Sequence, residues 1–534
     1  MCFMNAIFRF SVLFLFFVSV RTHAVDRPNI VFIFSDDHAT QAVGAYGYPV
    51  TKIARTPNLD LLAEAGMRFD RCMVTNSICG PSRATILTGK YSHLNGFYYN
   101  EDTEFDGSQD TFPKRLQRGG YQTALIGKWH LGSEPTGFNY WDILPGQGDY
   151  YNPDFIDAKG RYRAEGYVTD VVTKKAIRWL ESERDEERPF MLMVQHKAPH
   201  REWSPDLKYL DLWEEETFPE PETLFDDYTN RASAAREQDM SLEFSLELDM
   251  DLKIHGSKPG REYYRRSFSR LNPEQRQAWE VKMQARSREF HALKPKGNDL
   301  VRWKYQQYIK DYMRCIRSVD DSVGRIHECL QKNGLLENTV FIYSSDQGFY
   351  LGEHGWFDKR FMYDESYRTP LLVSWPGVVK PGSVDSNLVS NLDFAQTFLE
   401  MAGVKAPSVM QGRSLVPLLR GETPAWRKYH YYHYYEYPGW HMVYRHEGVY
   451  DGRYKLIHYY DVNEWELIDT QKDPLELKSV YKEPEYASIC KQLKIALSKK
   501  KTEFKVPTGI PQPRQVHNPI RYYSTHRREA EMKQ

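Results

Sequence analysis

Short runs of β-branched and aromatic residues, separated by longer helical stretches, constrain the fold of this chain most strongly. Residues 28–34 read Pro-Asn-Ile-Val-Phe-Ile-Phe, a continuous run typical of a strand buried on both faces. Similar runs occupy residues 121–126, 190–195, 339–343 and 370–375, and helical patterns cover residues 169–183 and 301–332. This alternation predicts an α/β fold with a large mixed, mostly parallel sheet and helices on both faces.

The 534 residues are enough for more than one structural unit. We expect a catalytic domain over residues 25–423, interrupted by a charged surface insertion at about 206–299, where periodic apolar positions become scarce. Residues 424–505 are predicted to form a smaller antiparallel subdomain with a hairpin at Asp451-Gly452, and residues 506–534 an extended polar tail. With 71 Lys and Arg against 72 Asp and Glu, global charge gives no attraction to nucleic acid.

The N-terminus has the pattern of a secretory leader. Residues 10–20 are apolar but too few to span a bilayer, and Thr22-His23-Ala24 resembles a cleavage site. We therefore expect a signal peptide over residues 1–24, no transmembrane segment in the mature chain, and export to the periplasm, the extracellular space or a lysosome, depending on the host. Five cysteines follow the leader, at positions 72, 79, 315, 329 and 490, an odd number that argues against a disulfide scaffold.

The segment Cys79-Gly80-Pro81-Ser82-Arg83 carries the strongest chemical signal. A cysteine at a helix start, next to backbone N–H donors and a guanidinium, lies where an anion can bind. On physical grounds alone, the segment is also consistent with an ordinary helix N-terminus that carries a buried thiol and has no chemical role. Residues 79–89 resemble the type I sulfatase signature C-x-P-S-R-x-x-x-L-T-G at every specified position, and the similarity extends over residues 27–421.

This resemblance implies an alkaline-phosphatase-like sandwich and a specific nucleophile. In the family the cysteine is oxidised to formylglycine by a maturation enzyme, and the hydrated aldehyde attacks sulfur; we expect this fate for Cys79. Asp36-Asp37 and Asp346-Gln347 each follow a predicted buried strand, a pattern that suits either turns or oxygen ligands for Ca²⁺ or Mg²⁺. The resemblance identifies these four, with Cys79, as Ca²⁺ ligands, although Gln347 replaces the usual asparagine.

Three further motifs match catalytic positions of the family. In Gly127-Lys128-Trp129-His130-Leu131-Gly132, the match implies a sulfate clamp at Lys128 and a proton acceptor at His130. His200 matches the histidine that contacts the leaving oxygen, and Lys359 a second sulfate-binding lysine. Arg83 of the signature is expected to polarise the nucleophile.

The tyrosine-rich stretch at residues 429–445 suits either an aromatic sheet core or a sugar pocket. We expect His433, Glu436, His441 and Arg445 to line the pocket. The run at residues 346–376 resembles N-acetylglucosamine-6-sulfatase-like carbohydrate sulfatases. The sequence therefore predicts a secreted carbohydrate sulfatase whose substrate is a sulfated carbohydrate, including glycosaminoglycans. Two alternatives stay open: a phosphate or phosphonate ester hydrolase of the same superfamily, and an inactive sugar-binding homologue.

Overall fold

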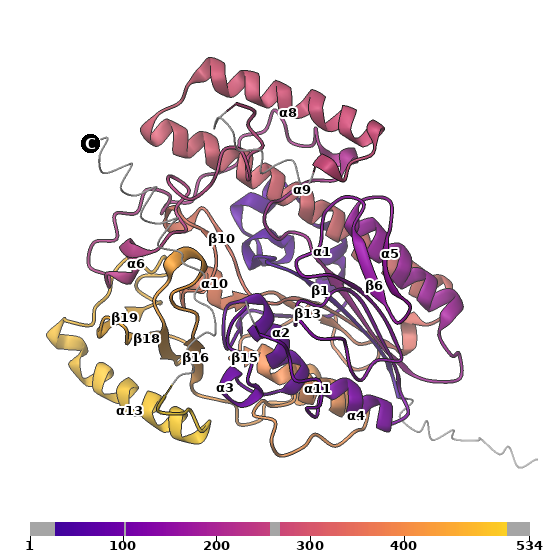
Figure 1. The fold of residues 1–534 in the computed structure, drawn as a ribbon. Coiled ribbons are helices and arrows are strands. Elements are labelled where there is room, and N and C mark those ends of the chain that lie inside the picture. The colour runs from indigo at the N-terminus through magenta and orange to yellow at the C-terminus, as the bar shows by residue number, and fades with distance from the viewer. Residues whose placement is uncertain (1–26, 101–102, 257–267, 510–534) are drawn as a thin grey trace, which may run out of the picture.

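The computed structural model describes residues 27–100, 103–256 and 268–509, and it confirms the predicted α/β architecture (Figure 1). A ten-stranded sheet crosses the molecule. Its central strands are parallel, and β1 pairs in parallel with both of its neighbours. The order along the sheet is β14 (Ser383–Asp385), β2 (Met67–Phe69), β13 (Leu371–Ser374), β9 (Thr339–Ser345), β1 (Asn29–Ser35), β8 (Phe190–His196), β4 (Gln122–Lys128), β5 (Tyr140–Leu144), β6 (Asp154–Asp157) and β7 (Gly160–Arg163). Antiparallel pairs occur towards both edges, so the sheet is mixed.

Helices cover both faces of this sheet, as expected because its central strand β1 is buried at every position. Val31 and Ile33 of β1 belong to one hydrophobic cluster, whereas Ile30 and Phe32 belong to the other. The first cluster includes residues of α1 (Pro57–Glu64), α5 (Val168–Arg178) and α9 (Gly297–Lys332). The second includes residues of α2 (Cys79–Thr88), α4 (Phe112–Arg118) and α11 (Phe394–Met401), which lie on the opposite side in Figure 1.

The antiparallel sheet predicted near the C-terminus is present. It contains β16 (His430–Tyr434), β17 (His446–Tyr450), β18 (Tyr454–Tyr459) and β19 (Glu464–Asp469), and α13 (Ala487–Glu503) packs on one face. The predicted hairpin joins β17 to β18. Gly452 in this turn has a φ of 94°, a value that favours glycine over residues with a side chain.

The segment expected to be a surface insertion has many exposed positions, and part of it also packs into the core. Its main helix is α8 (Pro273–Leu293), whose N-terminus is closed by a capping box between Asn272 and Gln275. Trp279 and Met283 of α8 are buried, as is Leu252 in the irregular chain before it. The segment therefore combines exposed positions with a few side chains that reach the core.

Shorter elements complete the described chain. They are α3 (Ser92–Asn95), α6 (Ala234–Glu237), α10 (Asp364–Tyr367), α12 (Val416–Leu419), β3 (Cys72–Met73), β10 (Tyr350–Leu351), β11 (Phe357–Asp358), β12 (Arg368–Thr369) and β15 (Val389–Ser390). The predicted signal peptide and nearly all of the predicted tail lie outside the described residues. Within the described ranges no helix is sufficiently long and apolar to cross a membrane. The five cysteines found there are all buried, and none forms a disulfide.

Candidate active site

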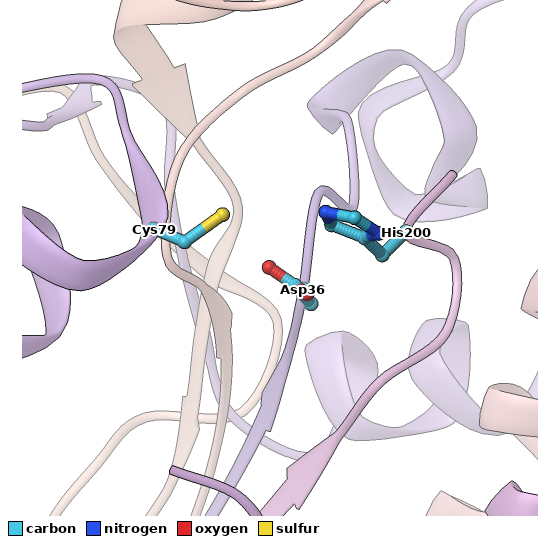
Figure 2. A group of neighbouring side chains, drawn as sticks. All are labelled: Asp36, Cys79 and His200. Atoms are coloured by element: carbon cyan, nitrogen blue, oxygen red, sulfur yellow. The ribbon is translucent and has the colours of Figure 1, made fainter. Parts of the chain in front are cut away.

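The carboxyl ends of the central strands bring the candidate residues to one edge of the sheet. Asp36 follows β1, Asp346 follows β9, and Lys128 is the last residue of β4. The chain after β8 supplies His200, and the first residue of α2 is Cys79. Asp36, Cys79 and His200 each bring one ligand atom to within 4.8 Å of the other two (Figure 2). Chemistry gathers here because parallel strands end at a common edge.

Three carboxylates form the acidic part of the site. Asp36, Asp37 and Asp346 are at most 1% exposed, and one oxygen of each lies within 4.8 Å of the others. Among the described residues, Asp36 Oδ1, Asp37 Oδ2 and Gln347 Oε1 are buried without a hydrogen-bond partner. Buried oxygens of this kind are costly unless a cation binds them, and all are the hard ligands that Ca²⁺ prefers. These residues therefore fit the metal that the sequence predicted.

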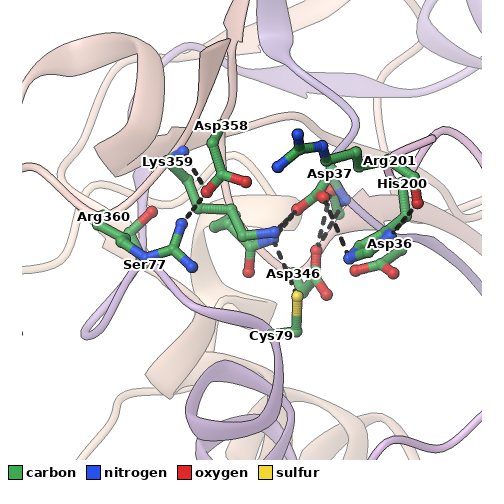
Figure 3. Close-up of polar contacts among 12 residues, drawn as sticks. Asp36, Asp37, Ser77, Cys79, His200, Arg201, Asp346, Asp358, Lys359 and Arg360 are labelled. Atoms are coloured by element: carbon green, nitrogen blue, oxygen red, sulfur yellow. Dashed lines mark hydrogen bonds and ion pairs between the residues drawn. The ribbon is translucent and has the colours of Figure 1, made fainter. Parts of the chain in front are cut away.

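Three basic side chains lie against these carboxylates. Arg83 donates from Nε and Nη2 to Asp346 Oδ2 at 3.1 and 2.9 Å. Lys128 Nζ contacts Asp36. Figure 3 shows Lys359, whose Nζ contacts Asp37. Burial disfavours the charged form of Lys359, but the carboxylates, led by Asp37, outweigh it and raise the pKa of that lysine. The positive charge needed to hold a tetrahedral oxyanion is thus present at neutral pH.

Cys79 is fully buried at the N-terminus of α2, with its Sγ 3.8 Å from Gln347 Nε2. Burial, followed by the charge of Asp36, raises the pKa of the Cys79 thiol to about 12. A thiol with this pKa remains protonated at neutral pH and is a poor nucleophile, since the thiolate is the reactive species. The unmodified thiol is therefore a weak nucleophile in this environment.

The two candidate histidines are both held in the neutral form. The ring of His200 is oriented by its Nδ1, which lies 2.6 Å from Arg201 O, and its Nε2 lies 3.9 Å from Asp37 Oδ2. Burial, reinforced by Lys128, lowers the pKa of both His200 and His130 well below the usual value. His130 Nδ1 is buried and has no hydrogen-bond partner in the described chain. Neutral imidazoles of this kind can accept a proton. His196 instead contacts Ser322 Oγ at 3.0 Å, in agreement with a structural role.

A cavity of about 1120 Å³ opens beside His130 and is rich in aromatic rings. Its walls include Tyr98, Tyr99, Trp129 and Trp141. Ring faces at this position can stack on the apolar face of a sugar. Sequence reasoning missed Tyr98 and Tyr99, because two tyrosines in a loop carry no spacing signal that separates a cavity wall from a packed core.

The structure separates the four predicted pocket residues. His433 is only 2% exposed in β16, where its Nδ1 and Nε2 contact the hydroxyls of Tyr431 and Tyr460. It therefore belongs to the aromatic sheet core that the sequence left open as the other interpretation. Arg445 forms an ion pair with Asp461. Sequence spacing could not distinguish these positions from a pocket wall, since both environments select for aromatic and polar residues.

Glu436 and His441 lie closer to the site. Glu436 Oε2 accepts a hydrogen bond from Asn100 N at 2.9 Å, and Asn100 lines the aromatic cavity. His441 Nε2 lies 3.3 Å from Asp358 Oδ2, and Asp358 also accepts from Lys359 N at 2.9 Å. Glu436 therefore contacts a residue of the aromatic cavity, and His441 contacts the residue that precedes Lys359.

Two residues that flank Lys359 were not predicted. Asp358 and Arg360 form an ion pair with each other, and both have a positive φ, 78° and 95°. Arg360 Nε is buried and has no partner among the residues described. Figure 3 shows this pair on the far side of Lys359 from Asp37. The strained turn thus holds a guanidinium nitrogen, without a hydrogen-bond partner in the described chain, next to Lys359.

Comparison with known proteins places these motifs in context. A family model described as Sulfatase matches residues 28–404, and one described as N-sulphoglucosamine sulphohydrolase, C-terminal, matches residues 352–503. The chain is 49% identical over 490 residues to an N-acetylglucosamine-6-O-sulfatase of Bacteroides thetaiotaomicron, covering 90% of this chain and 87% of that protein. It is 29% identical over 428 residues to the human N-acetylglucosamine-6-sulfatase, covering 75% and 66% respectively.

Solved structures agree with this relationship. One solved protein is described as a complex with its substrate, D-glucosamine-2-N,6-O-disulfate. It is 48% identical to this chain and has a TM-score of 0.87. The match covers 90% of this chain and 99% of the solved chain. A phosphonate monoester hydrolase of Silicibacter pomeroyi is 20% identical with a TM-score of 0.67, covering 89% and 95%. At 20% identity, the similarity to the phosphonate monoester hydrolase shows only that the two proteins share a fold.

Proposed function

This chain belongs to the sulfatase family and is a sulfuric ester hydrolase, and we propose that it removes the 6-O-sulfate from glucosamine units of a sulfated carbohydrate. The observation that carries the proposal is the 49% identity over 490 residues to an N-acetylglucosamine-6-O-sulfatase. The aromatic walls of the cavity beside His130 agree with a sugar ligand.

Two groups that the family implies would be held by residues described above. Asp36, Asp37, Asp346 and Gln347 would bind Ca²⁺, and Cys79 would be the residue that a maturation enzyme converts to formylglycine. When present, the hydrated aldehyde supplies a nucleophilic oxygen and Ca²⁺ supplies positive charge. The position of Cys79 at the N-terminus of α2, with its Sγ beside Asp36, supports this proposal.

The remaining chemistry falls to side chains of this chain. A sulfate ester carries negative charge and departs from a poor leaving group, so the site must neutralise charge and supply a proton. Lys128 and Lys359 would bind the non-bridging oxygens, while Arg83 holds Asp346 in place. His200 brings one ring nitrogen to within 4.8 Å of Asp36 and Cys79. The negative charge of the bound sulfate ester would favour uptake of a second proton by this neutral imidazole, and the imidazolium would then protonate the departing sugar oxygen. His130 would then accept the proton whose removal releases sulfate.

Neighbouring groups would select the sugar. Arg360 and Asp358 flank Lys359, and His441 contacts Asp358, so three polar groups lie next to the sulfate-binding lysine. Polar groups placed in this way can hydrogen-bond the hydroxyls of a bound ring. Glu436 accepts a hydrogen bond from the backbone N–H of Asn100, a residue that lines the aromatic cavity, and would hold that part of the cavity wall in place.

We also propose that the protein is exported after removal of residues 1–24. The catalytic unit would span residues 25–423, including the segment at about 206–299, with a C-terminal unit at residues 424–505. The connection between β16 and β17 of the C-terminal unit supplies His441 and Glu436 to the borders of the site, so both units would be required for activity.

The test is a matched substrate panel combined with peptide mass spectrometry. The purified protein is expected to carry formylglycine at position 79 and to release sulfate from 6-O-sulfated N-acetylglucosamine. Galactose-6-sulfate and 3-O-sulfated glucosamine serve as controls, and an aryl phosphate with the same leaving group as an aryl sulfate tests the phosphatase alternative. Faster turnover of galactose-6-sulfate, or of the phosphate, would overturn the proposed substrate.

A further inference from the structure

The aromatic cavity beside His130 is larger than one sulfated sugar unit needs. Its volume is about 1120 Å³, whereas pockets that enclose a single drug-sized ligand have volumes of about 300–1,000 Å³. A monosaccharide sulfate is smaller than most such ligands, and its sulfate group would lie at Lys128 and Lys359, neither of which lines this cavity. The cavity therefore has space for a further part of the substrate.

Two lining residues join the cavity to the candidate catalytic centre. One is His130, the proposed proton acceptor. The other is Asn100, whose Oδ1 accepts a hydrogen bond at 2.8 Å from the backbone N–H of Gly80, the residue after Cys79. A saccharide whose sulfate lies at the catalytic centre can therefore extend into the cavity.

The walls of the cavity suit a sugar ring and its hydroxyls. Tyr98 and Trp141 are partly exposed aromatic residues of the lining, and their ring faces can stack on the apolar face of a sugar. Asn100, Thr103 and Ser133 add neutral polar groups to the same walls. Aromatic surface combined with a few polar groups is typical of a site that binds an uncharged polar ligand.

Charge decides which kind of sugar this cavity suits. Of its described lining residues, only Glu104 and Glu134 carry a charge at neutral pH, and none is a lysine or an arginine. Both glutamates are exposed, and within the described ranges neither forms an ion pair or a side-chain hydrogen bond. The loops that carry them lie together, because Phe105 N donates to Leu131 O at 2.9 Å. The cavity is therefore negatively charged, in contrast to the lysine-rich sulfate site next to it.

We propose that this cavity binds an uncharged sugar joined to the sulfated glucosamine unit, and that Glu104 and Glu134 select against a neighbour that is a uronic acid or is itself sulfated. This inference rests on the proposed function. An anionic neighbour would face two carboxylates that have no counter-charge in the described lining, and like charges placed together disfavour binding. Because both glutamates are exposed, salt should screen this repulsion.

The test compares three substrates that contain the same 6-O-sulfated N-acetylglucosamine. One is the monosaccharide, and the other two are disaccharides with glucose or with glucuronic acid in the same linkage, so that they differ only at the carboxylate. Separate pairs carry the neighbour on either side of the sulfated unit, and the pair that is hydrolysed faster is compared. We expect kcat/KM for the glucose disaccharide to exceed that for the monosaccharide by about three- to tenfold, and that for the glucuronic acid disaccharide by about tenfold.

The outcomes separate this inference from the proposed function. Equal kcat/KM for the two disaccharides, or a lower value for the glucose disaccharide than for the monosaccharide, would overturn the inference while the hydrolysis of the monosaccharide upheld the proposed function. Failure to release sulfate from all three substrates would overturn both.

Two variants test the role of the glutamates. In the double variant Glu104→Gln with Glu134→Gln, the preference for the glucose over the glucuronic acid disaccharide should fall at least about threefold, and added salt should lower the wild-type preference in the same direction. Glu337→Gln is the matched control, because Glu337 is an exposed glutamate just before β9, at the opposite end of the sheet, and this variant should keep the wild-type preference. An unchanged preference in the double variant would overturn the proposed selection.

Discussion

Arg83 holds Asp346 through two nitrogens on one carboxylate oxygen, at 3.1 and 2.9 Å, with both side chains buried. The same guanidinium donates to Gln195 Oε1 and to Lys128 O, so it ties the ends of three central strands together. A planar fork can make this set of bonds, and an ammonium cannot. This residue therefore couples the geometry of the candidate metal ligand Asp346 to that of Lys128.

Arg83→Lys should lower kcat/KM by about 10²–10³-fold, because the charge is retained but the fork is lost. Arg115→Lys is the matched control, since Arg115 pairs with Asp110 outside the site and its loss should leave kcat/KM unchanged. Steady-state kinetics with a sulfated monosaccharide measures both. Wild-type kinetics in Arg83→Lys would show that charge alone suffices at this position.

Cys79→Ser should perform at most a single turnover and accumulate a sulfated enzyme. The serine sulfate ester lacks the second hydroxyl whose deprotonation, in a hydrated aldehyde, re-forms the carbonyl and expels sulfate. Intact-protein mass spectrometry after substrate addition would detect one added sulfate. Cys315→Ser replaces another buried thiol, in α9, and is expected to leave turnover intact. Repeated turnover by Cys79→Ser at the wild-type rate would contradict the covalent mechanism.

His200→Gln should distinguish proton donation from simple substrate binding. For a sugar sulfate, whose alcohol is a poor leaving group, we expect kcat to fall by about 10²–10⁴-fold. For an aryl sulfate with an acidic phenol, the fall should be less than about tenfold, since that leaving group needs little protonation. An equal loss on both substrates would indicate that His200 positions the substrate and does not donate the proton.

Chelation should abolish activity and lower thermal stability, because Asp36, Asp37 and Asp346 would then repel one another in a buried site. Restoring Ca²⁺ to about 100 times its Kd should return about 2.7 kcal/mol of stability. Asp37→Asn should require a higher Ca²⁺ concentration for the same recovery. Calorimetry with and without chelator measures the effect, and an activity insensitive to chelation would refute the metal assignment.

Asp320 should make the protein less stable as the pH rises. Its carboxylate accepts from Asn58 N and Leu59 N at the start of α1, but burial outweighs these bonds and raises its pKa to about 6. The folded state therefore binds this proton more tightly than the unfolded chain, whose aspartate pKa is about 3.9. The resulting stability is complete below pH 4 and is lost as the pH rises to about 6.

Asp320→Asn should abolish this pH dependence, so that the variant gains about 2–3 kcal/mol relative to the wild type between pH 4 and pH 7. Thermal unfolding midpoints measured across this range give the comparison. Asp321→Asn, at the next and partly exposed position of α9, is the control. Parallel pH curves for Asp320→Asn and the wild type would show that the carboxylate ionises in the folded state as it does in the unfolded one.

The catalytic motifs were accessible from the sequence because each is local. The strand at residues 28–34 is apolar at every position, and a sharp change to Ser35-Asp36-Asp37 marks its end. Cys79 and Arg83 lie within one turn of the same helix, so their spacing alone brings them near each other. The parallel sheet then follows from strand and helix alternation, and the sheet dictates that these motifs meet at one edge.

In the tyrosine-rich C-terminal region, the sequence did not distinguish residues of the sheet core from residues of the candidate site. His433 and His441 are both histidines among aromatic residues, yet one lies in the sheet core and the other borders the candidate site. Arg360 and Asp358 acquire their place from a strained turn, and Tyr98 from a loop that packs against the C-terminal sheet. No periodicity encodes these contacts, because residues distant in sequence create them when the two units pack.

The sequence alone thus predicted the candidate residues at the carboxyl ends of the central strands, including the candidate nucleophile and the candidate acidic ligands, since these depend on patterns a few residues long. Only the tertiary structure decided which aromatic and polar residues face the cavity, and it alone placed Arg83 against Asp346 and His441 against Asp358. The physical reason is that burial and pairing depend on the neighbours that packing supplies, and residues from distant segments provide them.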